Sequence, residues 1–243
     1  MPSASARSGT LQEGQVRAMF DRIAGVYDLM NSVMTAGLHH RWRERAADLA
    51  ELRPGDRALD VATGTGDLAI ELARRVGPAG EVVGSDFSEG MLDRARAKAP
   101  QLRWEWADAL DLAYPDGGFD AATVGFGARN FADLDRGLAE MARVVRPGGK
   151  VVVLEITTPQ QPPLSTFFSL WFDRIVPLMG RFDDAYTYLP ASVRRFPGPE
   201  GVGAAMARAG MTDVRWVLTA GGIIAIHHGR VASGRVDASR AGG

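Results

Sequence analysis

The chain has 243 residues, with 28 Lys and Arg side chains against 29 Asp and Glu side chains, so its formal net charge is −1. Nucleic-acid-binding proteins usually carry a clear basic excess, and we therefore expect no nucleic-acid partner. Cysteine is absent, which excludes disulfides, a thiolate nucleophile and cysteine-ligated metals, and favours a cytoplasmic protein. No group of residues has the spacing of metal ligands, so we predict no metal cofactor.

Neither end of the chain has the pattern of a folded or membrane-spanning segment. Residues 1–14 are rich in Ser and Ala and lack the apolar core of a signal sequence, so we predict a disordered lead. A second disordered segment is predicted at 230–243.

The apolar stretch at 167–180 contains Asp173 and Arg174 and is too short to cross about 30 Å of hydrocarbon. We therefore predict a single domain over residues 15–229.

Between residues 57 and 156, short β-branched runs alternate with helical patterns. This alternation is typical of a parallel sheet with helices on both faces, whose ligands bind at the carboxyl ends of the strands. Pro147-Gly148-Gly149 is predicted to end the third helix and turn the chain into the fifth strand. The predicted strands are 57–61, 81–85, 102–106, 119–124 and 151–156, and the predicted helices are 66–76, 88–99 with Ser88 as N-cap, and 134–145.

The pattern changes in the C-terminal part of the chain. A predicted helix at 199–209 leads into strands at 213–218 and 223–228, joined by the Gly-containing turn 219–222. Such a turn predicts an antiparallel hairpin at the edge of the sheet, which makes a mixed sheet of seven strands. Residues 15–52 look mostly helical, and residues 157–197 are rich in aromatic residues, Pro and Arg. We expect both segments to cap the strand ends.

The segment LDVATGTGDLA, residues 59–69, lies between a predicted strand and a predicted helix. Gly64 and Gly66 let the backbone pass close to a ligand, and the helix N-terminus behind them offers free N–H groups. Read as G-x-G-x-x-A, the loop also fits a dinucleotide site. However, Asp60 precedes the glycines, where a carboxylate would repel a pyrophosphate and would suit a ligand with an ammonium group.

Two more acids follow the next two strands. Asp86 ends the second strand, and a carboxylate at that place binds two ribose hydroxyls. Asp108 follows the third strand, where it can accept hydrogen bonds from an amino-purine edge. Each acid alone is also explained as a cap for local N–H groups. As an ordered set with Asp60, they predict a ligand with a cationic end, a ribose and a purine but no pyrophosphate, which is S-adenosylmethionine.

Seven segments resemble one known family, the C-methyltransferases of quinone biosynthesis, which methylate demethylmenaquinone or its ubiquinone-pathway counterpart. The glycine loop is shared by most class I methyltransferases, whereas the segments at 20–31, 125–131 and 188–197 are specific to the family. The resemblance covers about residues 15 to 229 and implies a class I, Rossmann-like three-layer α/β fold. The segments are FDRIAGVYDLMN (20–31), LDVATGTGDL (59–68), DFSEGML (86–92), GFGARNF (125–131), RPGG (146–149), YLPASVRRFP (188–197) and GGIIAIH (221–227).

The resemblance also implies contacts with the cofactor S-adenosylmethionine. Many family members have a Ser where this chain has Gly125, so we expect only a backbone contact there. The implied contacts are Thr63, Asp86, Asp108 and Ala109, and we add Asp60, Gly64, Gly66, Phe87 and Gly125 to the expected cofactor-binding residues.

Methyl transfer to carbon requires alignment of the nucleophile and ionisation of a ring hydroxyl. Arg129 is expected to stabilise the resulting oxyanion and Asn130 to orient it, although pairing of Arg129 with Asp133 or Asp135 is an alternative. His227 is the best base candidate because imidazole titrates near pH 6.5, with an outward-facing residue of an edge strand as the alternative. His39 and His40 are assigned to a solvated helix face.

The acceptor predicted by the resemblance is an isoprenoid quinol. Tyr27 is expected to cover the cofactor or donate to the quinol, with a core Tyr as the alternative. Phe168 and Trp171 are expected to line the site of the isoprenoid tail, with packing of the cap on the sheet as the alternative. Arg174, Arg181, Arg194 and Arg195 are candidates for contact with lipid phosphates. Peripheral membrane contact and a homodimer are both left open.

We therefore predict that the protein transfers a methyl group to a ring carbon of demethylmenaquinol, giving menaquinol. One alternative is the benzoquinol of the ubiquinone pathway, and another is a methyltransferase for a different small molecule. An NAD-dependent oxidoreductase fits the glycine loop, but Asp60 and the terminal hairpin argue against it. A ligand-binding module without catalytic activity is the last alternative.

Overall fold

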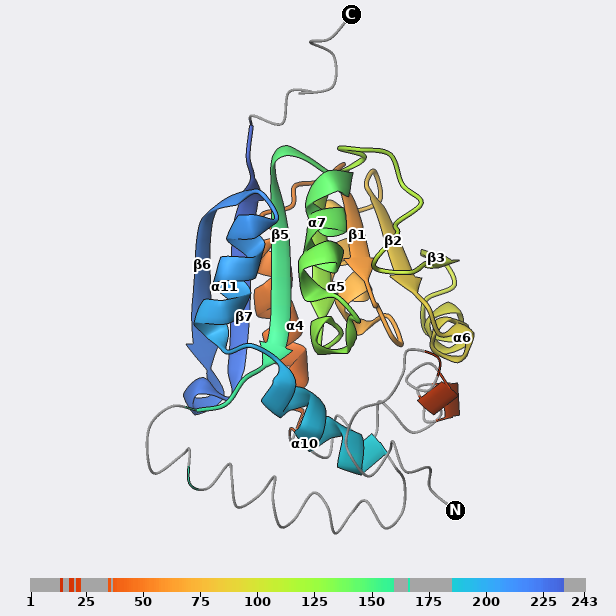
Figure 1. Ribbon diagram of the computed structural model, residues 1–243. Coiled ribbons are helices and arrows are strands. Elements are labelled where there is room, and N and C mark those ends of the chain that lie inside the picture. The colour runs from red at the N-terminus through yellow and green to blue at the C-terminus, as the bar shows by residue number, and fades with distance from the viewer. Residues whose placement is uncertain are drawn as a thin grey trace, which may run out of the picture.

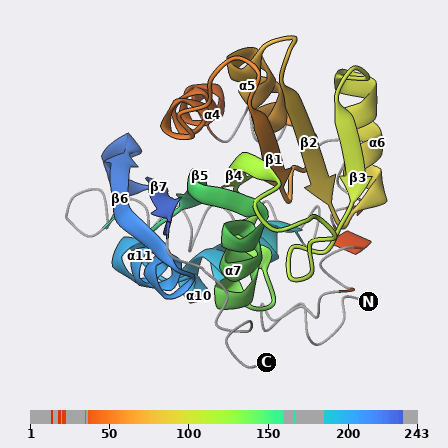
Figure 2. The same ribbon diagram turned by 90° about the horizontal axis from the view of Figure 1, so that it is seen from above.

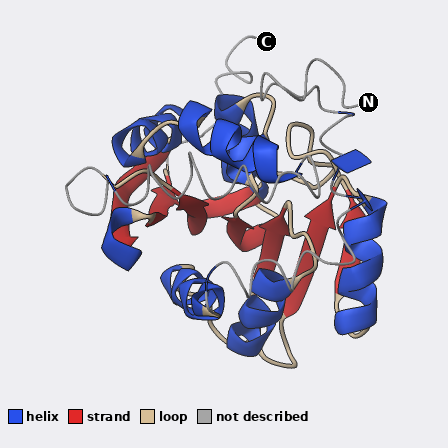
Figure 3. Cartoon of the chain, turned by 90° about the horizontal axis from the view of Figure 1, so that it is seen from below, coloured by secondary structure: helices blue, strands red, loops and turns tan. Residues whose placement is uncertain are grey.

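Seven strands form one mixed sheet at the centre of the molecule, in the order β3-β2-β1-β4-β5-β7-β6 (Figure 1). The structure is a computed structural model that describes residues 37–159 and 185–233, together with residues 14, 18–19, 21–22, 35 and 166. Helices lie on both faces of the sheet and make a three-layer α/β fold, as predicted (Figures 2 and 3). None of the helices in the described ranges is long and apolar enough to cross a membrane.

Five neighbouring strands of the sheet run parallel. Central parallel strands are buried on both faces, which explains the continuous β-branched run at residues 151–153 of the fifth strand. The structure confirms each predicted strand, with one boundary shifted by one residue in three of them and the start of the fifth strand six residues earlier than predicted. The strands are β1 (Arg57–Val61), β2 (Glu81–Asp86), β3 (Arg103–Trp106), β4 (Phe119–Gly125) and β5 (Val145–Ile156).

The C-terminal hairpin is also confirmed. Strand β6 (Met211–Thr219) is joined to β7 (Ile224–Val231) by the single 3-10 turn η3 (Ala220–Gly222). The two strands pair antiparallel, and β7 also pairs antiparallel with β5. Strand β7 therefore lies between β5 and β6, and β6 forms the edge of the sheet.

The helices bury two separate apolar clusters against the two faces of the sheet. On one face, the cluster includes Leu68, Leu72 and Leu92, and on the other it includes Leu138 and Met206. Ser88 caps α6 as predicted, since its hydroxyl accepts a hydrogen bond from the backbone N–H of Met91. Helices α4 (Leu38–Leu49), α5 (Asp67–Val76) and α6 (Glu89–Lys98) cover the first face, and α7 (Leu134–Val144) and α11 (Pro199–Arg208) cover the second.

The prediction for the Pro-Gly-Gly segment is wrong. Helix α7 ends at Val144 and β5 begins at the next residue, so the segment does not separate them. Instead, Phe119 pairs with Val145 whereas Ala121 pairs with Lys150, which leaves residues 146–149 as a bulge within β5. Gly148 has φ +79°, a conformation that favours glycine, so its role is to shape this bulge.

Two described helices belong to the segments predicted to cap the sheet. Helix α4 lies within 15–52 and packs against α5. Helix α10 (Ala185–Arg195) lies within 157–197, below the end of β5 in Figure 1, and contacts the 3-10 helix η1 (Ala128–Asn130). Because the carboxyl ends of the parallel strands lie at that end of the sheet, α10 is placed beside the predicted ligand site.

Candidate active site

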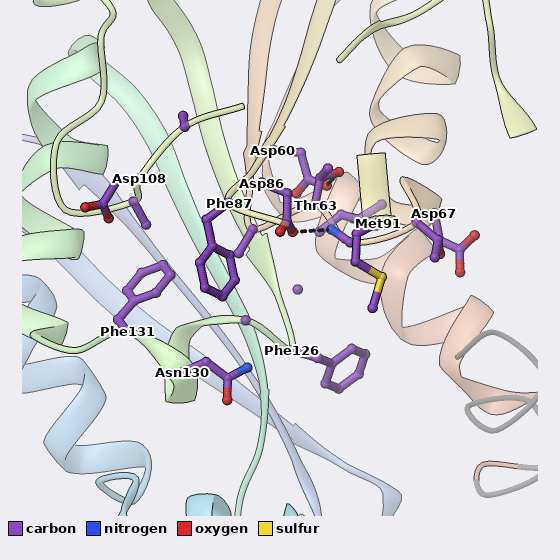
Figure 4. A pocket seen from close by; sticks show the side chains of 18 of the residues that line it. Asp60, Thr63, Asp67, Asp86, Phe87, Met91, Asp108, Phe126, Asn130 and Phe131 are labelled. Carbon is purple, nitrogen blue, oxygen red and sulfur yellow. Dashed lines mark hydrogen bonds between the residues drawn. The ribbon is translucent and has the colours of Figure 1, made fainter. Parts of the chain in front are cut away.

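A pocket with about 900 Å³ of open space lies at the carboxyl ends of β1, β2 and β4. Residues from separate loops line it, because the parallel strands bring their ends to one edge of the sheet. Nine of the residues predicted from the sequence line this pocket: Asp60, Thr63, Gly64, Asp86, Phe87, Asp108, Ala109, Gly125 and Asn130 (Figure 4).

Asp60, near the end of β1, is only 1% exposed. Its Oδ2 accepts a hydrogen bond from Oγ1 of Thr63 at 2.5 Å, and its Oδ1 accepts one from Oγ1 of Thr123 at 2.6 Å. Burial raises the pKa of Asp60 to about 6, because a carboxylate without bulk water is poorly solvated. A cationic group that enters the pocket would stabilise the ionised form.

Asp86, at the end of β2, ties the glycine loop to the sheet. Its Oδ2 accepts a hydrogen bond from the backbone N–H of Gly64 at 2.8 Å, which Figure 4 marks with a dashed line. Its Oδ1 accepts one from the N–H of Ser88 at 2.9 Å. Burial raises the pKa of Asp86 to about 6 as well. This side chain therefore both shapes the pocket and presents a carboxylate to it.

The two glycines of the loop have different roles. Gly64 has φ +57° and lines the pocket. Gly66 has φ +86° and precedes α5, but it is not among the described residues that line the pocket. A Cβ at Gly66 would lie 2.4 Å from Cη2 of Trp104. Gly66 is therefore required by the close approach of Trp104 and by its own backbone conformation.

Apolar and polar groups alternate at the far end of the pocket. The rings of Phe87 and Phe131 lie near each other, with Asn130 below them in Figure 4. Asp108 lines the same end, and its Oδ1 accepts a hydrogen bond from the N–H of Leu110 at 2.8 Å. Asp108 thus accepts a hydrogen bond from a local N–H group, as expected of a cap, and it also borders the pocket, as expected of a ligand-binding residue.

The structure does not bring Arg129 into the pocket. Its guanidinium forms an ion pair with Glu155 over 2.7 Å, and both side chains are buried. The alternative partners proposed from the sequence are engaged elsewhere: Asp133 accepts from the N–H of Arg136, and Asp135 pairs with Arg208. The position of Arg129 therefore does not support a direct contact with the acceptor.

His227 also lies away from the pocket. It is 1% exposed on β7, and its Nε2–H donates to the backbone carbonyl of Pro199 at 2.9 Å. Burial lowers its pKa, so the neutral form is favoured. Since β7 is an inner strand, the outward-facing alternative does not apply either, and the structure gives His227 a structural role instead of that of a base.

Several pocket residues were missed at the sequence level, among them Arg43, Asp67 and Phe126. Arg43 comes from α4, where it is one of several arginines and no motif distinguishes it. Phe126 has φ +62°, rare for a bulky residue, and such strain often accompanies functional sites. His39, assigned to a solvated face, is in fact buried and accepts a hydrogen bond from Arg43.

The predicted substrate residues Tyr27, Phe168 and Trp171 lie outside the described residues, as do Arg174 and Arg181. The two remaining candidates for lipid contact, Arg194 and Arg195, are exposed on α10.

The chemistry of the pocket fits S-adenosylmethionine. Two buried carboxylates at neighbouring strand ends suit an ammonium group and a ribose, and the Phe87 and Phe131 rings suit a purine. An antiparallel β7 between β5 and β6 distinguishes the sheet from a plain dinucleotide fold. Together, the fold and the site define a class I S-adenosylmethionine-dependent methyltransferase. Residues 8–231 match the ubiE/COQ5 methyltransferase family, and the chain belongs to this family.

Named relatives are similar over most of their length. A demethylmenaquinone methyltransferase of Thermus thermophilus is 47% identical, covering 87% of this chain and 99% of the relative. The ubiquinone/menaquinone biosynthesis C-methyltransferase UbiE of Teredinibacter turnerae is 40% identical, covering 90% of this chain and 92% of the relative. Among solved structures, a SAM-dependent methyltransferase of Thermotoga maritima has a TM-score of 0.64 at 18% identity, covering 88% of this chain and 98% of that one, which supports the fold.

Proposed function

We propose that this protein methylates a ring carbon of demethylmenaquinol and so produces menaquinol. The observation that carries this proposal is the 47% identity to demethylmenaquinone methyltransferases of Thermus thermophilus and Deinococcus radiodurans. The pocket supports it, because eight of the nine residues expected to hold the cofactor and the polar Asn130 line one space. The second candidate acceptor is the benzoquinol of ubiquinone biosynthesis, which is favoured by relatives named UbiE at 40% identity.

In this proposal, the acids at the strand ends bind the cofactor. The Asp60 carboxylate accepts hydrogen bonds from the ammonium group, and the Asp86 carboxylate accepts them from the ribose hydroxyls. Asp108 and Ala109 border the purine. Thr63, Gly64 and Gly125 complete the wall of the pocket, and the Phe87 ring packs on the purine. The bound cofactor supplies an electrophilic sulfonium methyl, which leaves a neutral thioether when it is transferred in line to carbon.

The acceptor is expected on the side of the pocket where Asn130 lies, below the Phe87 and Phe131 rings in Figure 4. The nucleophilic carbon forms when a ring hydroxyl ionises and delocalises its charge, and the ring proton leaves after transfer. The Asn130 amide is placed to donate to the hydroxyl oxygen and orient the ring. We propose that Arg129 acts through its contacts with Glu155 and the Phe126 carbonyl, as a positioning residue.

The test is a direct assay by mass spectrometry. The enzyme is incubated with methyl-labelled S-adenosylmethionine and reduced demethylmenaquinone, and the quinone fraction is searched for one added methyl group. The demethylated benzoquinol of the ubiquinone pathway is assayed in parallel. Labelled menaquinone as the main product supports the proposal, whereas labelling of the benzoquinol alone favours the second candidate. Labelling of neither would contradict both.

A further inference from the structure

One basic side chain enters an otherwise acidic pocket. Among the described residues that line it, Arg43 is the one with a cationic side chain, and it is 6% exposed. The same wall includes Asp60, Asp67 and Asp86. A buried guanidinium that faces a ligand site usually has an anionic group as its partner. The anionic partner of Arg43 is therefore supplied either by the protein or by the ligand.

The guanidinium of Arg43 is held in place from two sides. Its Nη1 donates to Nδ1 of His39, one helical turn earlier on α4. Its Cζ lies 5.5 Å from the centre of the Phe126 ring, which is a cation–π contact. Neither His39 nor Phe126 carries a negative charge, so the two residues hold the guanidinium in place without neutralising it.

The acid that pairs with Arg43 is shared with another cation. Nη2 of Arg43 lies 3.5 Å from Oδ2 of Asp67, whereas Nζ of Lys98 lies 2.7 Å from Oδ1 of the same carboxylate. Charge-assisted hydrogen bonds usually measure about 2.7–2.9 Å, so Lys98 is the closer partner. Burial opposes ionisation of Asp67, but Arg43 and Lys98 together hold its pKa below the ordinary value. Asp67 is therefore shared between two cations and lies closer to Lys98 than to Arg43.

The positive charge of Arg43 lies near the negative charge expected at Asp60. Arg43 favours the ionised form of Asp60 electrostatically, which places the two groups within range of each other. A cation and a carboxylate on one wall match the two charged groups of a free α-amino acid. S-adenosylmethionine carries such a group at its methionyl end, with a carboxylate and an ammonium on the same carbon.

We propose that Arg43 binds the carboxylate of the cofactor's methionyl group while Asp60 binds its ammonium group. This inference rests on the proposed use of S-adenosylmethionine as methyl donor, and it adds a residue of α4 to the cofactor site. The planar guanidinium can donate two parallel hydrogen bonds to a carboxylate, which a lysine cannot. The protein should therefore select ligands that carry the carboxylate, and α4 should contribute to that selection.

The test compares two ligands that differ only in the carboxylate. S-adenosylhomocysteine and its decarboxylated analogue are titrated into the full-length protein by calorimetry. The wild type should bind S-adenosylhomocysteine about 10- to 100-fold more tightly. Arg43→Gln should reduce this ratio to below about threefold and leave the affinity for the decarboxylated analogue unchanged. Arg45→Gln, an exposed arginine on the same helix, is the matched control and should keep the wild-type ratio.

The outcomes separate this inference from the proposed function. Equal affinity of the wild type for the two ligands would overturn the role of Arg43 and leave methyl transfer intact. Equal weakening of both ligands by Arg43→Gln would show that Arg43 only supports α4. If Arg43→Gln fails to fold in a thermal melt, Arg43→Lys replaces it and should give an intermediate ratio. A wild type that binds neither ligand would contradict the use of this cofactor, and the inference with it.

Discussion

Arg129 and Glu155 form a buried ion pair next to the pocket. Nη1 of Arg129 donates to Oε1 of Glu155 at 2.7 Å, and the backbone N–H of Arg129 donates to Oε2 at 3.2 Å. Arg129 also donates to the carbonyl of Phe126, the residue with the strained backbone. One pair therefore joins the end of β5 to the loop that carries Phe126 and Asn130 into the pocket.

We predict that Glu155→Gln lowers the turnover number about 10-fold or more, because a displacement of about 1 Å in a reacting geometry has a large effect on rate. The variant leaves Arg129 as a buried charge without its acid, so the free energy of unfolding should fall by about 3–5 kcal/mol. The affinity for S-adenosylhomocysteine should change less than the rate, since Glu155 does not line the pocket. Steady-state kinetics, chemical denaturation and calorimetry measure the three quantities.

The control is Glu44→Gln, an exposed acid on α4, which should leave rate and stability at wild-type values. A folded Glu155→Gln variant with unchanged turnover would show that the ion pair has no influence on the acceptor site.

Replacing Asp86 by Ala should weaken cofactor binding by about 10- to 100-fold, because the ribose hydroxyls lose a charged acceptor and the Gly64 N–H loses its partner. Calorimetric titration with S-adenosylhomocysteine measures the effect. Asp93→Ala removes an exposed acid from α6 and serves as the comparison. Wild-type affinity in a folded Asp86→Ala protein would remove this residue from the cofactor site.

Cofactor affinity should depend on pH near 6. Asp60 and Asp86 both have pKa values raised to about 6 in the free protein, above the values expected in the unfolded chain. Their contribution to stability is therefore full at low pH and is lost as the pH rises through about 6. Arg43 faces Asp60 and favours its ionised form, whereas Asp86 opposes it.

A bound ammonium group should lower the pKa of Asp60, so that binding near pH 6 releases a proton. Affinity should then rise from pH 5 to pH 7 by up to about 10-fold per unit for each group and level off above that. Titrations in buffers with different ionisation enthalpies count the protons released. Asp60→Asn should remove its share of the pH dependence. An affinity that does not change between pH 5 and pH 7 would contradict this account.

Much of the fold follows from local sequence pattern. Buried parallel strands such as β5 contain continuous apolar runs, here residues 151–154, and Ser88 marks a helix start by its chemistry. The prediction for the Pro-Gly-Gly segment was wrong because Pro and Gly are common both at helix ends and in bulges. Only the pairing of β4 with β5 distinguishes a bulge from a helix end here. Local pattern therefore predicts elements more reliably than the irregularities between them.

Some residues of the site were predictable from the sequence and others were not. Asp60 and Asp86 were predictable because parallel topology brings consecutive strand ends to one edge. The partner of Arg129 was not, since Glu155 lies 26 residues further along the chain and only the finished sheet brings the two together. Arg43 was missed for a related reason, because its position depends on how α4 packs against the sheet.

The buried position of His227 leads to the last prediction. Its Nε2–H donates to the Pro199 carbonyl, and a glutamine amide can reproduce this hydrogen bond in a similar volume. His227→Gln should therefore keep the turnover number within about threefold of wild type and leave the pH–rate profile unchanged, because the essential base in such a profile must reach the reacting proton. His227→Ala, which leaves a cavity and an unsatisfied carbonyl, should lower the midpoint of thermal unfolding more than His227→Gln does. Loss of the basic limb of the pH–rate profile in a folded His227→Gln protein would restore His227 as the base.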